Sequence, residues 1–451
     1  MNTWHIPRAD APLQATVRVP GSKSLTNRYL VLAAQAAGTS VIHNPLYSRD
    51  TRLMMDALRN LGVTISAENI QEITENTADT QGSLSVTGLG KATSNPILPG
   101  NPDRSAQKDA AHIDCGLAGT VMRFVPPLVA TWGGAAHFAG DAQALSRPIA
   151  PLLSALRTLG ATVTGTAVPF TISARPGLSG GRIDIDASAS SQFLSALLLS
   201  GASWPDGLQI RHTGSSLPSV AHIEMTLANL RDYGVDVRHI STNEWHVFPG
   251  IPRARSVTVE PDLSNAATFI AAAVVTGGQV EVMHWPERTT QAGNAICDIA
   301  RRCGATVELL ADRLRVTGSH RVLGGDFDLG DIGELTPVVA AMLACSTEAS
   351  AMTNIGHLRG HETDRLAALA RELQNLGAKV EETETALYIN SPVKYGGEWE
   401  TYHDHRMVMA AAVVGAFIGD VHARNPGTVA KTLPNFVPLW EEMFAESSRG
   451  A

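Results

Sequence analysis

The sequence predicts an α/β protein of two domains, each assembled from repeats that contain both helices and strands. Its 451 residues exceed what one ordinary hydrophobic core holds, so two domains are expected. Alanine-rich helix-like segments alternate with β-branched strand-like segments along the whole chain. One short pattern also recurs five times: LRNLGVTI from Leu58, LRTLGATV from Leu156, LRDYGVDV from Leu230, ARRCGATV from Ala300 and LQNLGAKV from Leu373.

Each copy of this pattern is typical of a helix end followed by a strand. A glycine just after a helix takes the left-handed backbone conformation at low cost, and the Val, Ile and Thr residues behind it favour a strand. The five predicted cap positions are Gly62, Gly160, Gly234, Gly304 and Gly377.

A second pattern, a polar start leading into an apolar helix, lies upstream and marks six units at a spacing of about 70 residues. The six starts are SLTNR from Ser24, AGTVMR from Ala118, SSQF from Ser190, SNAATF from Ser264, ELTPVV from Glu334 and DHRMVM from Asp404. Because these helices are apolar nearly all round, we expect them to be buried. Three units per domain, with helices inside and sheets outside, would hide them. Lys91 to His112 is predicted to be a surface loop, and Ala15 to Val19 a strand.

Composition excludes several function classes. A net charge of −8 argues against a nucleic-acid or anionic-membrane surface. The N-terminus shows no signal-peptide pattern, and apolar runs such as Ala266 to Thr276 are too short to span a bilayer. The four cysteines have no metal-ligand spacing, so we expect free thiols in a reducing cytoplasm.

The segment PGSKSLTNR, from Pro20 to Arg28, suggests an anion site. A glycine turn, Lys23, Ser24 and Arg28 stand at the start of a helix, where backbone N–H groups and the helix dipole favour negative charge. It is no P-loop, because the earlier glycine of that motif is missing. A plain helix cap with solvent-facing basic residues is the alternative interpretation.

Polar residues collect at the other helix starts or in the loop after the next strand. They are Gly119, Thr120, Arg123 and Arg147 in the second unit, Ser190, Ser191, Gln192 and Gly214 to Ser219 in the third, Glu334 and Arg359 to Leu366 in the fifth, and His403 to Met407 and Lys431 in the sixth. The fourth unit has no cation at its start, although Ser264 and Asn265 remain candidates. If equivalent helices point the same way, these groups form an electropositive site.

Ordinary structural roles compete with these assignments. Arg123 could brace a carboxylate, Asp364 and Arg365 could form a surface pair, and Ser190 with Ser191 could cap a helix. The triplet from His403 to His405 looks like a metal cluster, but adjacent residues point in different directions and no matching ligand spacing follows.

Taken together, the motifs PGSKSLTNR, LAGTVMR, SRPI, SSQF, RGHETDRL, DHRM and KTLPN closely resemble, in this order, those of the EPSP synthases (3-phosphoshikimate 1-carboxyvinyltransferases). The resemblance runs from residue 20 to about residue 435. It implies a two-domain inverted α/β barrel, with one domain from residues 1–20 and 259–451, the other from residues 21–258, and an active site in the cleft between them.

The implied reaction joins shikimate 3-phosphate and phosphoenolpyruvate by addition and elimination, releasing phosphate. We therefore expect a cytoplasmic monomer that binds these small anions and needs no cofactor or metal. The sister family, UDP-N-acetylglucosamine enolpyruvyl transferases, is one alternative, although Lys23-Ser24 and the setting of Cys115 speak against it. A non-catalytic phospho-ligand-binding protein is the other.

Carried over by position, the resemblance assigns roles to fifteen residues. Those implied to hold shikimate 3-phosphate are Lys23, Ser24, Arg28, Ser190, Ser191, Gln192, Ser219 (with Ser216 as the alternative), Glu334 and His361. Those implied to hold phosphoenolpyruvate are Lys23, Gly119, Arg147, Gln192, Arg365, Arg406 and Lys431. Glu334 would be the general base and Glu362 the acid, with Lys23 also catalytic. Many members have Asp where Glu334 stands and Lys where His361 stands, so two positions depart from the common pattern.

Overall fold

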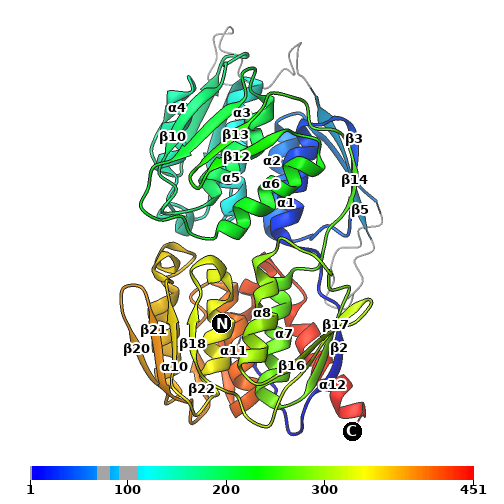
Figure 1. Cartoon of the computed structure of the whole chain (residues 1–451), viewed down its shortest axis with the longest axis vertical. Helices are drawn as coiled ribbons and strands as arrows, with labels where there is room; N and C mark the ends of the chain where they lie inside the picture. The colour runs from blue at the N-terminus through cyan, green and yellow to red at the C-terminus, as the bar shows by residue number, and fades with distance from the viewer. Residues whose placement is uncertain (1–2, 69–81, 91–109, 451) are drawn as a thin grey trace. The chain divides into compact units, whose positions relative to one another are not determined.

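The computed structural model describes residues 3–68, 82–90 and 110–450, and the chain divides into two compact units (Figure 1). The central unit comprises the described residues between Lys23 and Val259, and the terminal unit comprises residues 3–22 and 260–450. Most of the predicted loop from Lys91 to His112 lies outside the described residues. Its end is wrong, because Ala111 and His112 begin strand β6 (Ala111–Asp114).

The elements of each unit alternate as expected for an α/β protein. Those of the central unit are α1 (Lys23–Gln35), β3 (Ala37–His43), α2 (Arg49–Asn60), β4 (Thr64–Glu68), β5 (Ser83–Leu89), β6, α3 (Gly119–Trp132), β7 (Gly134–Ala139), α4 (Ala150–Thr158), β8 (Thr162–Thr164), β9 (Phe170–Ala174), β10 (Gly181–Ile185), α5 (Gln192–Ser200), β11 (Leu208–His212), α6 (Val220–Asp232), β12 (Val237–Ser241), β13 (Glu244–Val247) and β14 (Ser256–Thr258).

The terminal unit also contains short 3₁₀ helices near site residues: η5 carries Glu334, η6 directly precedes His361, and η7 ends at Lys431. Its elements are β1 (Thr3–His5), β2 (Gln14–Val17), α7 (Leu263–Thr276), β15 (Gln279–Met283), α8 (Ile296–Arg302), β16 (Thr306–Leu309), β17 (Arg313–Thr317), β18 (Asp326–Asp328), η5 (Gly330–Leu335), α9 (Thr336–Leu343), β19 (Ser350–Thr353), η6 (Gly356–Gly360), α10 (Arg365–Asn375), β20 (Lys379–Glu382), β21 (Leu387–Ser391), β22 (Gly397–Trp399), α11 (His405–Ile418), β23 (Val421–Arg424), η7 (Pro426–Lys431) and α12 (Phe436–Gly450).

Within the described residues, five of the six repeats share one topology, strand–helix–strand–helix–hairpin. The first two strands pair in parallel around the first helix, and the hairpin adds its second strand next to them, as in the sheet β6-β7-β9-β8. The sheets β10-β11-β13-β12 and β18-β19-β21-β20 have the same order. The structure therefore confirms the repeated α/β architecture.

Two four-stranded sheets are completed by strands that are distant in sequence. β14 lies parallel to β3, with Ser256 opposite Val41. β2 lies parallel to β15, with Gln14 opposite Gln279. The sixth sheet has three strands in the order β1-β23-β22, with N-terminal β1 antiparallel to β23. Each repeat thus receives its first strand even where the chain passes from one unit to the other.

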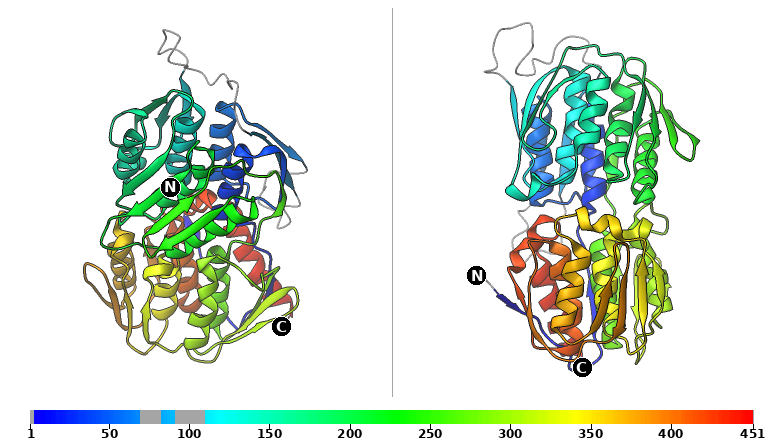
Figure 2. Two further views of the ribbon diagram at one scale, coloured as in Figure 1. Left: turned by 45° about the horizontal axis from the view of Figure 1, so that its top comes forward. Right: turned by 90° about the vertical axis from the view of Figure 1, so that its left-hand side faces the viewer.

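The core of each unit is formed by the first helices of its three repeats. In the central unit α3 is buried at every position from Gly119 to Ala130, and α1 from Leu25 to Gln35. In the terminal unit α11 is buried from His405 to Ala416. The right-hand view of Figure 2 shows the blue and cyan helices of the central unit side by side, with strands around them. Strands such as β9 alternate buried and partly exposed residues, so one face of each sheet covers the helices.

The predicted cap glycines behave as expected. Gly62, Gly160, Gly234, Gly304 and Gly377 follow α2, α4, α6, α8 and α10, with φ between +74° and +101°. A side chain at such a φ is strained, which explains glycine in this recurring pattern.

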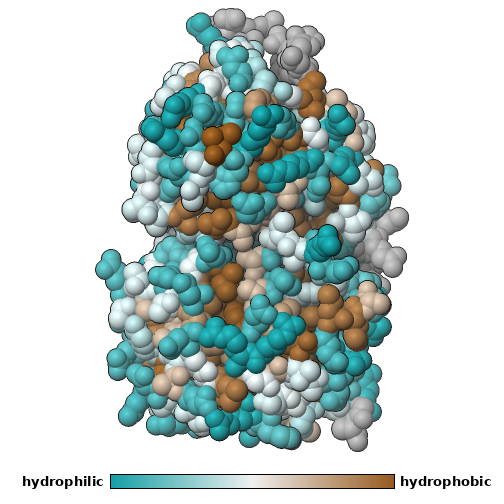
Figure 3. Space-filling view, in the orientation of Figure 1, coloured by the Kyte–Doolittle hydropathy of each residue, from teal (hydrophilic) through white to brown (hydrophobic). Residues whose placement is uncertain are grey.

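On the face drawn in Figure 3, hydrophobic residues form separate patches among polar ones. None of the helices in the described part of the chain has the length and apolar character needed to cross a bilayer.

Candidate active site

The buried helices of the central unit start next to one another. Asn27 of α1 donates its Nδ2 to Thr120 Oγ1 of α3 at 2.7 Å, and Arg123 Nη1 of α3 donates to Gln192 Oε1 of α5 at 2.8 Å. These contacts join the first turns of three parallel helices. Their dipoles therefore add positive potential at the same end of the unit, where an anion is favoured.

Lys23, the first residue of α1, is held by a buried carboxylate. Its Nζ donates to Asp50 Oδ2 at 3.3 Å, and the Asp50 side chain in the first turn of α2 is only 3% exposed. Within the described residues the other oxygen, Asp50 Oδ1, has no hydrogen-bond partner. The contact keeps the ammonium group at the helix start.

Arg28 is buried rather than facing solvent, so the interpretation as a solvent-facing basic residue is wrong for it. Its Nε donates to Thr226 Oγ1 at 2.8 Å, its Nη1 to the Ser24 carbonyl at 3.0 Å, and its Nη2 to the His222 carbonyl at 3.1 Å. The guanidinium also lies over the Phe124 ring, 5.4 Å from its centre. Arg28 thereby ties α1 to α6 and packs against α3.

Two guanidinium groups converge on Gly119, the first residue of α3. A Cβ built there would lie 3.0 Å from Arg147 Nη2 and 3.2 Å from Arg123 Nη1. Arg147 Nη1 donates to the Leu117 carbonyl at 2.8 Å, and Arg123 Nη2 donates to the Pro148 carbonyl at 2.9 Å. The missing side chain leaves both cations close to the N–H groups of a helix start.

The serines of the central unit stand at two further helix starts. Ser190 Oγ accepts a hydrogen bond from the backbone N–H of Gln192 at 3.3 Å. Ser191 is buried and directly precedes α5, but its side chain makes no capping hydrogen bond. Ser219 precedes α6 with a left-handed φ of +55°, whereas Ser216 is exposed in the loop before it.

In the terminal unit the central feature is a buried pair between α10 and α11. Arg365 Nε donates to Asp404 Oδ2 at 2.8 Å and its Nη2 to Asp404 Oδ1 at 3.1 Å. Burial alone would lower the pKa of Arg365, but the carboxylates of Asp404 and Glu362 outweigh it and hold this pKa above its usual value. The interpretation of Asp364 and Arg365 as a surface pair is therefore wrong; Asp364 instead accepts from Arg359 at 2.7 Å.

Glu362 bridges two cations. Its Oε2 accepts from Arg365 Nη2 at 3.1 Å, and its Oε1 accepts from Lys431 Nζ. The side chains of Glu362 and Lys431 are both 9% exposed. His361, the preceding residue, contacts the same guanidinium through Nδ1, 3.2 Å from Arg365 Nη1.

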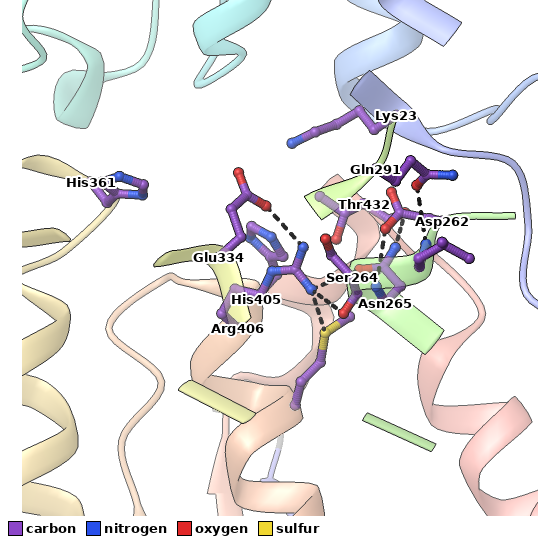
Figure 4. A network of polar contacts seen from close by, with 12 residues as sticks. Lys23, Asp262, Ser264, Asn265, Gln291, Glu334, His361, His405, Arg406 and Thr432 are labelled. Atoms are coloured by element: carbon purple, nitrogen blue, oxygen red, sulfur yellow. Dashed lines mark hydrogen bonds and ion pairs between the residues drawn. The ribbon is translucent and has the colours of Figure 1, made fainter. Parts of the chain in front are cut away.

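Glu334 pairs with Arg406, as Figure 4 shows. Arg406 Nη2 donates to Glu334 Oε2 at 3.1 Å, while its Nη1 donates to the Ser264 carbonyl at 2.8 Å and to Asn265 Oδ1 at 3.1 Å. The Glu334 side chain is 37% exposed and Arg406 only 6%. A fixed, buried cation thus holds a carboxylate that solvent can reach.

The structure brings the sequence-predicted residues into two groups, one in each unit. The central-unit group is Lys23, Ser24, Arg28, Gly119, Arg147, Ser190, Ser191, Gln192 and Ser219, all at or near helix starts. The terminal-unit group is Glu334, His361, Glu362, Arg365, Arg406 and Lys431, linked by the ion pairs above.

Among the partners of these residues, sequence reasoning missed Asp50. It named Arg123, Asn265 and the DHRM segment that begins at Asp404 as candidates, but not the contacts that they make. Arg123 donates to the Gln192 side chain and to the Pro148 carbonyl. Neither of these acceptors is a carboxylate, which was the alternative partner considered for Arg123. Within the ranges that the structure describes, no three His, Cys, Asp or Glu side chains are placed to hold a metal ion.

Comparisons with known proteins agree with these motifs. A family model for EPSP synthase (3-phosphoshikimate 1-carboxyvinyltransferase) matches residues 7–440. A 3-phosphoshikimate 1-carboxyvinyltransferase of Mycobacterium ulcerans (strain Agy99) is 47% identical over 451 residues, covering 99% of this chain and 98% of the relative.

Solved structures share the fold. An EPSP synthase of Acinetobacter baumannii superposes with a TM-score of 0.77 at 24% identity, covering 99% of this chain and 98% of the other. The enolpyruvyl transferase NikO of Streptomyces tendae gives a TM-score of 0.72 at 18% identity, covering 99% and 97%. With nearly the whole sequence matched by the family model and by a close relative, the chain belongs to the EPSP synthase (3-phosphoshikimate 1-carboxyvinyltransferase) family.

Proposed function

We propose that this protein transfers the enolpyruvyl group of phosphoenolpyruvate to the 5-hydroxyl of shikimate 3-phosphate, releasing phosphate. The observation that carries the proposal is the linked terminal-unit group, in which Glu334 and Glu362 are each paired with buried cations. Addition–elimination at an enol phosphate needs one group that removes a proton and one that supplies it, within a cationic setting for the phosphate.

Glu334 acts as the general base on the 5-hydroxyl. An adjacent cation favours the ionised form of a carboxyl, and Arg406 Nη2 lies 3.1 Å from Glu334 Oε2. The carboxylate is partly exposed, so a substrate hydroxyl can approach it. The oxygen of that hydroxyl then attacks C2 of phosphoenolpyruvate.

Glu362 supplies the proton that C3 of phosphoenolpyruvate gains in the addition step. In the elimination step C3 loses a proton as the bond between C2 and the phosphate oxygen breaks, which restores the C2–C3 double bond and releases phosphate. The two oxygens of Glu362 face Arg365 and Lys431. When the anionic substrate engages these cations, it competes with Glu362 for them, and the carboxyl can then accept the proton that it later delivers. Proton delivery is thereby linked to substrate binding.

The remaining cations hold the substrates and stabilise the departing phosphate. Phosphoenolpyruvate is bound by the cationic residues and helix starts assigned above: Lys23, Gly119, Arg147, Gln192, Arg365, Arg406 and Lys431. Shikimate 3-phosphate is bound mainly through hydroxyl, amide and cationic groups: Lys23, Ser24, Arg28, Ser190, Ser191, Gln192, Ser219, Glu334 and His361. Fixed cations in a buried setting interact strongly with the charge that moves onto phosphate. We further propose a cytoplasmic monomer that acts without cofactor.

Phosphate release tests the proposal. Purified protein is incubated with phosphoenolpyruvate and either shikimate 3-phosphate or UDP-N-acetylglucosamine, and phosphate is measured over time. Release that requires shikimate 3-phosphate is the expected result. Release only with UDP-N-acetylglucosamine would assign the chain to the sister activity, and binding without release would indicate a non-catalytic protein.

A further inference from the structure

His357 lies directly behind the main chain that carries Glu334. A Cβ built on Gly333 would lie 2.5 Å from His357 Nε2, 3.0 Å from its Cε1 and 3.1 Å from Leu358 Cδ2. Real side chains do not approach a Cβ as closely as 2.5 Å, so the imidazole occupies the place that a side chain at residue 333 would need. Gly333 is buried and directly precedes Glu334.

The two loops in this contact are fixed to each other. η5 follows β18 and η6 follows β19, and these two strands pair in parallel. Asn354 donates its Nδ2 to Asp328 Oδ2 at 2.7 Å, which joins the ends of the strands. Within η5 the backbone departs from helical geometry at Ile332, with φ −124° and ψ +30°. The position of Glu334 therefore depends on a turn that is not a regular helix.

His357 is surrounded by charged groups of the site. Burial lowers its pKa below the usual value, a hydrogen bond to the Asn354 backbone opposes this shift, and Arg365 lowers the pKa further. Asp331 and Glu334 act in the opposite direction, and the His361 ring lies with its centre 6.0 Å away. The net lowering of the pKa favours the uncharged ring, which can pack beside the site without adding a cation.

We propose that His357 is a positioning residue for Glu334: its ring fills the space beside Gly333 and fixes the main chain that presents the carboxylate. This inference rests on the proposed function, in which Glu334 is the general base. His357 itself touches no reacting atom in this scheme. Displacing a catalytic group by about 1 Å can lower the rate about 100-fold, so a small shift of the turn is sufficient to matter.

Two substitutions of His357 distinguish its polar contact with the Asn354 backbone from the space that its ring fills beside Gly333. His357→Asn keeps a polar group near the Asn354 backbone but lacks the atoms that reach Gly333, whereas His357→Gln reaches further. We expect His357→Asn to lower kcat about tenfold to 100-fold, with KM for both substrates changed less than about twofold, and His357→Gln to retain most of kcat. His422→Ala, at a half-buried histidine of the β1-β23-β22 sheet, is the control and should leave kcat unchanged.

Measuring kcat in the Glu334→Ala variant, which lacks the proposed base, distinguishes a positioning role of His357 from general damage to the fold. If His357 acts through Glu334, His357→Asn lowers kcat in the wild type but not in Glu334→Ala. Loss of equal size in both backgrounds, or no loss in the wild type, would overturn the inference. Gly333→Ala adds an independent check: it should lower the thermal midpoint, and His357→Asn should reduce that penalty. Independent effects on the midpoint would show that the contact does not constrain the turn.

The wild-type assay keeps the two proposals apart. If the wild type releases phosphate and His357→Asn has the same kcat, the positioning inference alone is refuted. Absence of release by the wild type refutes the proposed function, and with it the role of His357 in catalysis.

Discussion

Arg365 and Asp404 form a two-point ion pair in which the arginine side chain is 2% exposed and the aspartate side chain is fully buried. Asp404 also caps α11 by accepting a hydrogen bond from the Arg406 amide at 2.9 Å. One carboxylate thus orients two cations of the site, one by a direct ion pair and one through the start of its helix. Isolated buried charges are costly, so each partner depends on the other.

Removal of the Asp404 side chain should strongly destabilise the terminal unit. Asp404→Ala leaves Arg365 short of a counter-ion and α11 without its cap, so we expect a loss of about 3–5 kcal/mol in the free energy of unfolding. Urea unfolding followed by circular dichroism measures it. Glu442→Ala, at an exposed position of α12 in the same unit, should cost less than about 0.5 kcal/mol. Equal midpoints for the two variants would contradict the prediction.

Glu334→Ala should lower kcat about 10²- to 10⁴-fold, because the proposed general base is lost. The partly exposed position of Glu334 predicts that the fold survives, which a thermal midpoint close to that of the wild type would confirm. Glu384→Ala changes an exposed carboxylate of the same unit and serves as the control. Activity in Glu334→Ala similar to that control would exclude the role.

Lys23→Ala should abolish turnover while leaving the protein folded. The substitution removes the ammonium at the start of α1 and leaves the Asp50 carboxylate, which is buried, without this cation. Steady-state kinetics with both substrates, alongside the exposed-lysine variant Lys394→Ala, measures the effect. Should Lys23→Ala fail to fold, the contact between Lys23 and Asp50 would instead be structural.

Gly119→Ala should raise KM for phosphoenolpyruvate about tenfold, which corresponds to about 1.4 kcal/mol. The added methyl group would meet Arg147 and Arg123 at 3.0–3.2 Å, so the guanidinium groups must move. Family resemblance also suggests weaker inhibition by glyphosate. Gly250→Ala, where a Cβ meets no atom within 4 Å, is the matched control. An unchanged KM and inhibition constant would place the phosphoenolpyruvate site elsewhere.

The four cysteines should be unreactive in the folded protein. All four are buried, and burial raises the pKa of Cys115 and Cys303 to about 12 and of Cys297 to about 11. A disulfide reagent at pH 8 should therefore modify less than one thiol per folded chain and all four after denaturation. Rapid reaction of Cys115 in the folded chain would contradict the prediction.

The same shifts predict a stability change at alkaline pH. Unfolded thiols lose their protons near pH 8.5, while the folded chain keeps them to about pH 11 or 12. The unfolded state then binds fewer protons, so the free energy of unfolding falls as pH rises through this window. A urea midpoint that is lower at pH 10 than at pH 8 would agree.

The parts of the fold that could be predicted are those determined by residues close together in the sequence. Cap glycines such as Gly160 and the buried helices depend on residues close together in the chain, and those features could be predicted. The pairing of β14 with β3 depends on residues more than 200 positions apart, and no local pattern encodes it.

The site was predictable to a similar extent. Lys23 and Arg406 stand at helix starts in recognisable motifs, and so does Glu334, the partner of Arg406; Asp50, the partner of Lys23, does not. Asp50 looks like an ordinary acidic residue in a first helical turn, and His357 like any loop histidine. Asp404 was visible as the first residue of the DHRM motif, but its ion pair with Arg365 was not, because that contact arises from packing between two helices.

The strands supplied from a distance impose an order on biosynthesis. Residues 23–259 include β14 and can complete their sheets once that strand has left the ribosome. The N-terminal strands β1 and β2 emerge first but must wait for β23 and β15, which are translated much later. During vectorial synthesis β1 and β2 are therefore without their partner strands while the middle of the chain is being translated.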